Sequence, residues 1–353
     1  MKRILFLSFI LLCVTGLLKA VDPGTKSMTF LNIAPNPRAS ALGEGFTALA
    51  DDVSAVYFNP AGIANLKNTQ VAANVNLYIA SINYFNFQAA HPFGFGTLGV
   101  NASFVSYGDI DNYENGQLLG TIAPSDVLAS LAYGLKITDK FQAGLSLKYV
   151  SEKLTDTYSG SAFGIDLGLL YLELFKHLNV GLVAQNIGSG PQFSQETGSL
   201  PLTIKLGTVY TYRLYRAVAG LKDINVLVDF IFPSDADMQT RYGLEAWWYN
   251  LGGGLLDAAL RIGAKFPTDF DVVSSLTFGA GIRMFNTQLD YAMVNFGDLG
   301  MTHRIGVLYR FGDIMKPFEP PPSKEEVKEE KKEEKPVEEE EEEIEEEFEF
   351  EEE

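Results

Sequence analysis

The sequence predicts an all-β fold: a 14-stranded antiparallel transmembrane β-barrel with an N-terminal plug before it and a disordered acidic tail after it. Three observations predict this fold. Apolar residues alternate with small or polar ones in segments of about ten residues, the segments number fourteen, and the last one ends in a distinctive pattern. The expected organisation is a signal peptide (1–20), a plug (21–69), the barrel (70–311) and the tail (312–353).

The N-terminus has the features of a secretory signal peptide. A basic start is followed by an apolar run over residues 4–18, and cleavage is expected after Ala20. A lipoprotein site at Cys13 is the alternative, but Leu12 before it is not small and the apolar run continues past it. If Cys13 leaves with the signal peptide, the mature chain has neither disulfides nor thiolate metal sites.

Alternation with a period of two indicates strands after residue 69. In the segment around 276–284 the even positions are apolar, whereas Thr277, Gly279, Gly281 and Arg283 are small or polar. A soluble sandwich would bury such apolar faces between two sheets, and alternation alone does not exclude it. An even number of long strands favours the membrane barrel. The expected strands are 70–80, 82–92, 96–106, 126–137, 140–151, 162–173, 178–186, 201–212, 223–232, 240–249, 258–266, 274–285, 287–295 and 302–311.

The connections also fit a barrel that is entered from the periplasm, in which long loops follow odd strands and short turns follow even ones. The long connections are 107–125, 151–161 and 187–200, the short ones are 91–95, 138–139 and 286–287, and two, 213–222 and 250–256, depart from the rule. We therefore expect the plug and the tail on the periplasmic side.

The last strand ends in a pattern of polar, glycine and hydrophobic positions, formed by Arg304, Gly306, Tyr309 and Phe311. This pattern resembles the terminal assembly signal of bacterial outer-membrane barrels. It implies recognition by the barrel assembly machinery and a location in the cell outer membrane, in contact with its lipid. An ordinary amphipathic strand is the alternative interpretation.

Residues 21–69 lack the strand alternation and are rich in small, helix-forming residues around 38–50. Asp51 or Asp52 can cap a short helix. Asn59 is expected to end that helix, because Pro60 disfavours helical geometry in the residue before it. A compact plug inside the barrel suits this segment.

The segment 45–62 resembles the N-terminal signature of FadL-like outer-membrane proteins, especially their PorV/PorQ branch. The residues that carry the resemblance are Asp51, Asp52, Asn59, Pro60, Ala61 and Gly62. The resemblance implies a barrel plugged by its N-terminal segment, with these residues fixing where the plug meets the first strand. For Asn59 a structural role is favoured over direct contact with a ligand.

The resemblance implies two functions of different classes. FadL-like transporters carry hydrophobic molecules, such as fatty acids or aromatic hydrocarbons, without an energy source, whereas PorV-like members serve type IX protein secretion. We expect passive transport of hydrophobic small molecules, with PorV-like secretion as the alternative.

Two features of the barrel are candidates for a hydrophobic route. Leu118, Leu119 and Ile122 in the 107–125 loop form a candidate ligand entrance, for which local packing is the alternative. In the third strand, glycines are candidates for a lateral kink that opens an exit, because glycine marks bends in strands. These glycines are Gly94, Gly96 and Gly99.

Inward positions of the barrel carry charges of both signs, which we expect to pair plug with wall. They are Lys148, Asp166, Lys205, Asp229, Glu245, Arg261, Lys265, Arg283 and Arg304. We expect neither an enzyme nor a metal site or cofactor, because His91, His177 and His303 are far apart and no catalytic set surrounds them. The sequence also lacks a phosphate-binding loop and a basic patch for nucleic acid.

The net charge of −18 is concentrated after Phe311. Residues 312–353 hold 21 acidic residues and 6 lysines, a net charge of −15, which leaves −3 for the rest of the chain. So little apolar sequence predicts disorder. The charge would attract a basic periplasmic partner or divalent cations, and inert solvation is the alternative.

Overall fold

The computed structural model describes residues 26–155, 158–193, 196–218, 220–267 and 275–312. The predicted signal peptide and the acidic tail after Gly312 lie outside the described residues.

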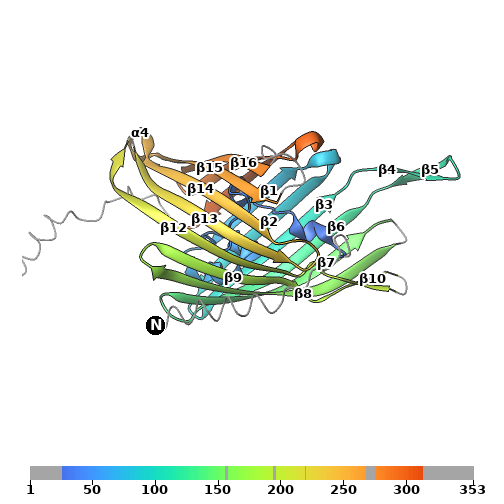
Figure 1. Ribbon diagram of the computed structural model, residues 1–353, viewed down its shortest axis with the longest axis horizontal. Helices are drawn as coiled ribbons and strands as arrows, with labels where there is room; N and C mark the ends of the chain where they lie inside the picture. The colour runs from blue at the N-terminus through green and yellow to red at the C-terminus, as the bar shows by residue number, and fades with distance from the viewer. Residues whose placement is uncertain (1–25, 156–157, 194–195, 219, 268–274, 313–353) are drawn as a thin grey trace, which may run out of the picture. The chain divides into compact units, whose positions relative to one another are not determined.

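Fourteen antiparallel strands form a closed barrel in the part of the chain that the structure describes (Figure 1). The barrel closes where β18 pairs with β1, with Gln70 opposite Arg310 and Leu77 opposite His303. The barrel strands are β1 (Gln70–Leu77), β2 (Asn83–Phe93), β3 (Gly96–Ser106), β6 (Ser125–Lys136), β7 (Phe141–Lys153), β8 (Ser159–Phe175), β9 (Leu178–Ile187), β12 (Thr203–Val218), β13 (Leu221–Pro233), β14 (Gln239–Asn250), β15 (Leu256–Phe266), β16 (Leu276–Met284), β17 (Thr287–Asn295) and β18 (Met301–Arg310).

The predicted alternation decides which side chains face outward. In β1, Asn74 and Asn76 are buried inside the barrel, whereas Val75 and Leu77 are exposed on its outer face. The same pattern leaves Phe85 and Phe87 of β2 exposed. An apolar outer face is what a lipid-facing barrel requires, and the predicted fold class is confirmed. Separately, no helix among the described residues is long and apolar enough to span a membrane.

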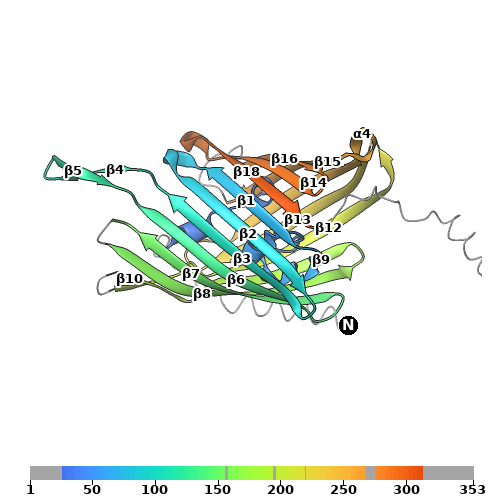
Figure 2. The same ribbon diagram turned by 180° about the vertical axis from the view of Figure 1, so that it is seen from behind.

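Long connections gather at one end of the barrel, the loop end, and short ones at the other, the turn end (Figures 1 and 2). The predicted exception at 213–222 was wrong, because β12 continues to Val218 and β13 begins at Leu221. At 250–256, α4 (Leu251–Gly254) lies between β14 and β15. Among the described residues, the loop end carries two β-ribbons and two short 3-10 helices. They are β4 (Ile110–Glu114) with β5 (Gln117–Ile122), β10 (Ser189–Phe193) with β11 (Glu196–Ser199), η3 (Ile79–Ser81) and η5 (Gly297–Leu299).

In its described residues, from Lys26 on, the plug has four short helices inside the barrel: η1 (Thr29–Asn32), α2 (Pro37–Ala41), α3 (Ala55–Phe58) and η2 (Pro60–Asn65). It begins at the loop end, where the Ser27 amide donates a hydrogen bond to the Ser199 carbonyl at 3.1 Å. It ends at the turn end, where η2 is followed by the start of β1. The plug therefore crosses the barrel from end to end. The expectation that plug and tail lie on the periplasmic side stays a prediction, since the tail lies outside the described residues.

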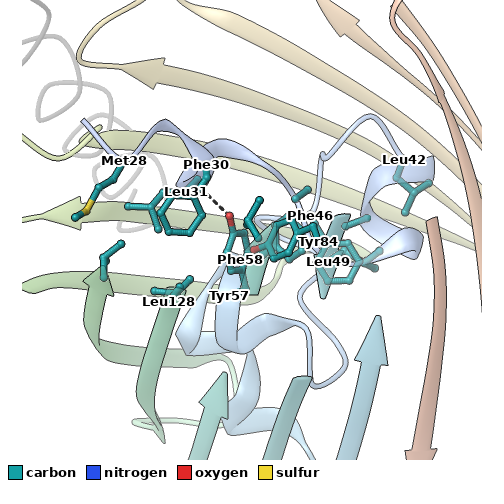
Figure 3. Packing of buried hydrophobic residues seen from close by; sticks show 14 of the residues in the cluster. Met28, Phe30, Leu31, Leu42, Phe46, Leu49, Tyr57, Phe58, Tyr84 and Leu128 are labelled. Atoms are coloured by element: carbon teal, nitrogen blue, oxygen red, sulfur yellow. Dashed lines mark hydrogen bonds between the residues drawn. The ribbon is translucent and has the colours of Figure 1, made fainter. Parts of the chain in front are cut away.

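Apolar packing explains the starting point of the plug. Met28, Phe30 and Leu31 are buried in one cluster with Tyr84 and Leu128, two inward side chains of the loop half of the barrel (Figure 3). Burial removes these side chains from water, which stabilises the N-terminal segment there. A second apolar cluster lies elsewhere in the lumen, so apolar packing is not confined to the loop half.

Candidate functional site

The Asn59–Gly62 part of the sequence motif lies where the plug meets the wall. Asn59 is extended, with φ −155° and ψ 102°, and α3 ends there as predicted. Its Nδ2 donates hydrogen bonds to the carbonyls of Thr47 at 2.8 Å and Leu169 at 3.2 Å, while its Oδ1 accepts one from the Ala61 amide. These bonds occupy the buried Asn59 amide and indicate a structural role.

Glycines of the wall make room for this motif. A β-carbon on Gly144 would lie 2.2 Å from the Pro60 carbonyl carbon. One on Gly62 of the plug would lie 2.2 Å from the Ala50 oxygen. Real β-carbons do not approach this closely, so Gly144 allows the plug to meet the wall and Gly62 allows the plug to pack on itself.

The two carboxylates of the motif bind one guanidinium. Arg38 Nη1 lies 2.6 Å from Asp51 Oδ1 and 2.8 Å from Asp52 Oδ2. Asp52 is buried and also accepts a hydrogen bond from the Ser54 amide at 2.9 Å. The N-cap of α3 is Ser54, with no side-chain capping bond, so the expectation that Asp51 or Asp52 caps the helix was wrong. Asp51 is half exposed.

Arg38 continues this contact into the wall. It binds Glu245 in a bidentate fashion, with distances of 2.8 and 2.9 Å, and Glu245 in turn accepts a hydrogen bond from Arg261 at 2.8 Å. Arg261 also binds Asp290 at 2.7 Å. All four side chains are nearly inaccessible to solvent. The predicted pairing of plug and wall charges is thus present here, in the charge-assisted, bidentate form that suits burial.

A second set of charges holds the middle of the plug. Arg304 donates to the Ala34 carbonyl at 3.1 Å, and Glu44 pairs with Lys265. Burial alone would raise the pKa of the Glu44 carboxyl, but the cations Lys265, Arg304 and Arg241 outweigh it and lower that pKa to about 2.

The residues of the predicted assembly signal divide between the two faces of the wall. Arg304 and Gly306 face the plug, and a β-carbon on Gly306 would lie 2.7 Å from Pro37. Tyr309 and Phe311 are exposed, with ring centroids 4.8 Å apart. The structure gives the inward pair a packing role, and recognition by an assembly machine stays a prediction.

One part of the wall is apolar on its inner face. Leu128, Val150 and Ala162 are paired across β6, β7 and β8 and are buried in the same cluster as Met28 and Leu31 of the plug. Sequence reasoning missed this inner face.

The outer face of the same strands carries a groove of about 800 Å³. Ala129, Tyr149 and Phe163 are paired across β6, β7 and β8, one residue along from the inner set. The groove is also lined by Leu131 and Ile165. Between residues 128 and 163, the wall therefore has apolar side chains on both faces.

The pairing of β8 with β9 is interrupted beside this groove. Ile165 and Ile187 form the pair nearest the loop end, and the register shifts between Ile165 and Leu167. Behind the shift, Lys148 binds both Asp166 at 2.7 Å and Asn186 at 2.8 Å. The same pair of strands shifts register a second time between Tyr171 and Phe175, away from the groove.

The glycines of the predicted lateral kink lie elsewhere. Gly94 is in the turn before β3, and a β-carbon on Gly96 or Gly99 would meet Tyr133 or Val56. β3 pairs with β2 and β6 without a register shift. These glycines therefore accommodate neighbouring side chains, and the ladder is continuous past them.

The candidate entrance residues lie on the β4–β5 ribbon, which extends beyond the loop end in Figures 1 and 2. Leu118 and Leu119 are exposed, and Ile122 is the last residue of β5. Their role as an entrance stays a prediction. Among the described residues, no group of His, Cys, Asp and Glu could hold a metal ion.

Comparisons with known proteins show what this architecture is similar to. A family model described as an uncharacterised protein family, UPF0164, matches residues 20–151, which span the plug and the strands from β1 into β7. No curated protein matches the sequence.

Two solved structures share the fold. The toluene transporter TbuX of Ralstonia pickettii is 13% identical with a TM-score of 0.51, and the match covers 79% of this chain and 99% of that one. The CymD monoaromatic hydrocarbon channel is 11% identical with a TM-score of 0.51, covering 79% of this chain and 98% of that one. The FadL-like fold is thereby confirmed, and membership of the PorV/PorQ branch stays a prediction.

Proposed function

We propose that this chain is an outer-membrane barrel that passively carries hydrophobic small molecules. The observation that carries the proposal is the wall of β6, β7 and β8, which is apolar on both faces. Leu128, Val150 and Ala162 line it inside, and Tyr149 and Phe163 line the groove outside. Binding on either side of this wall would remove a hydrophobic molecule from water and so lower its free energy.

The route that we propose runs from the loop end, past the plug, to the seam between β8 and β9. The expected lateral exit is thus assigned to the register shift near Ile165 in place of Gly94, Gly96 and Gly99. The transport of toluene or monoaromatic hydrocarbons by proteins of the same fold supports this class of cargo. Outer-membrane lipid and the barrel assembly machinery are the partners that the proposal requires.

The test compares two inward leucines of equal burial. Both leucines belong to one buried apolar cluster and are 1% exposed. Leu128→Asn places an amide behind the groove, whereas Leu227→Asn places one on β13, away from the groove. Uptake of labelled toluene by host cells whose outer membrane contains each folded variant is measured. We expect about a tenfold loss for Leu128→Asn, since an amide in an apolar path costs about 1–3 kcal/mol. Equal uptake by wild type, both variants and empty cells rejects the proposal.

PorV-like secretion is the second candidate function. It is favoured by the β4–β5 ribbon, whose exposed Ile110, Tyr113, Leu118 and Leu119 offer a surface for an exported protein. Deleting residues 110–122 leaves the barrel strands intact. Exported proteins that accumulate in the periplasm of the deletion strain, together with unchanged toluene uptake, would favour secretion over transport.

A further inference from the structure

A second pocket lies at the loop end of the lumen, between the plug and the wall formed by β12, β13 and β14. Its volume is about 350 Å³, within the range of sites for small ligands. Thr29, Asn32 and Glu44 of the plug line one side of it. Lys205, Arg241 and the Asp235 that follows β13 are among the residues that line the other.

This pocket contains opposite charges that do not neutralise each other. Among the described residues, Lys205 has no ion pair within 4.0 Å and no hydrogen bond, because Glu44 and Asp229 act on it only at longer range. Asp235, which is 9% exposed, likewise has neither in the described part of the chain. Arg241 Nε is buried without a hydrogen-bond partner there.

Unpaired charges in a partly enclosed site are costly, and other buried charges of the lumen are held in ion pairs. Arg38, Glu245 and Arg261, for example, are all paired. A simple anion would neutralise Lys205 and leave Asp235 unpaired, and a simple cation would do the reverse. A ligand with both charges satisfies both side chains.

We propose that this pocket binds a small zwitterion. Its carboxylate lies against Lys205 and Arg241, and its ammonium group lies against Asp235. Thr29, Asn32 and Gln239 supply polar neighbours for the rest of the molecule. A charged, polar lining does not suit an aromatic hydrocarbon, so this inference goes beyond the proposed function and stands independently of it.

The experiment is calorimetric titration of the folded, full-length mature protein in detergent. The probes are glycine, 4-aminobutyrate and 6-aminohexanoate, which differ in the separation of their charges, with butyrate and butylamine as single-charge controls. We expect one zwitterion to bind at least about tenfold more tightly than either control, because each control leaves one charge unpaired.

Variants connect the binding to the pocket. Lys205→Met and Asp235→Asn should each reduce the affinity for that zwitterion by about tenfold or more. Lys140→Met is the matched control, since Lys140 is 46% exposed and pairs with Glu173 near the turn end. The proposal is overturned if butyrate binds as tightly as the zwitterions, if no probe binds, or if Lys140→Met lowers affinity as much as Lys205→Met. Unchanged toluene uptake in the presence of the zwitterion separates this result from the transport proposal.

Discussion

The Asn59 side chain of the plug fills the space that a side chain on Gly168 of β8 would need: a β-carbon on Gly168 would lie 2.2 Å from Asn59 Oδ1. The Asn59 amide simultaneously bonds to the Leu169 carbonyl of the same strand. The plug motif and the wall glycine are therefore one structural feature, although 109 positions separate them in the sequence. A larger residue at position 168 would therefore have to displace the Asn59 side chain.

Replacing Gly168 with alanine should destabilise the folded barrel by about 1–3 kcal/mol, the usual cost of overpacking. Gly94→Ala is the control, because nothing lies within 4 Å of a β-carbon there. Urea unfolding in lipid vesicles and heat-modifiable gel migration measure the effect. In the double variant Asn59→Ala/Gly168→Ala, the two effects should be less than additive. Strict additivity would contradict the contact.

Replacing Arg38 with methionine should cost about 3–5 kcal/mol, because it leaves the buried Asp52 carboxylate without its ion pair and removes one of the two guanidinium groups that bind Glu245. Arg213→Met removes an exposed ion pair with Asp223 and should cost less than about 1 kcal/mol. The free energy of unfolding of both variants is compared by urea titration. A loss for Arg38→Met no larger than that for Arg213→Met would show that the plug is not held by this network.

The barrel could be predicted from the sequence because a period of two recurs in segment after segment. The bounds of β3 and β17 match the expected 96–106 and 287–295. The expectation failed where alternation ends before pairing does, as in β12, which continues to Val218 against β13. The β4–β5 ribbon was missed, although Asn115 and Gly116 between its strands are a strong hairpin signal.

The candidate site was harder to predict from the sequence, because it depends on which segments meet inside the barrel. The end of α3 at Asn59 was predicted because a residue before a proline prefers an extended backbone, a preference that depends only on the local sequence. The apolar inner face was missed, but the unbroken apolar run at 127–129 is a signal that both faces of a strand are apolar. The pocket at Lys205 and Asp235 joins residues that no local pattern connects.

The stability contributed by Glu44 should depend on pH. Because its folded pKa of about 2 lies below the ordinary value of 4.5, the contribution is fully present above about pH 4.5 and is lost as the pH falls through 2. Glu44→Gln should therefore be less stable than wild type at pH 7, by on the order of 3 kcal/mol. The difference between the two should close as the pH is lowered from 4.5 to 2. A difference that stays constant over this range contradicts the pairing with Lys265.

The path of the plug predicts that Thr29 and the residue after β18 lie at opposite ends of the barrel. The predicted mature chain has no cysteine, so single cysteines can report accessibility without a background. Thr29→Cys, which is exposed at the loop end, should react with a membrane-impermeant maleimide on intact cells, as should Asn115→Cys in the β4–β5 ribbon.

Asp139→Cys is exposed in the turn between β6 and β7 and serves as the opposite control, reacting only after the outer membrane is permeabilised. Labelling is quantified by the mass shift of the protein. If Thr29→Cys reacts together with Asp139→Cys, and not with Asn115→Cys, the plug begins at the turn end and the path through the lumen is wrong. If Asp139→Cys alone reacts on intact cells, the path stands, but the barrel lies in the membrane with its long loops facing the periplasm.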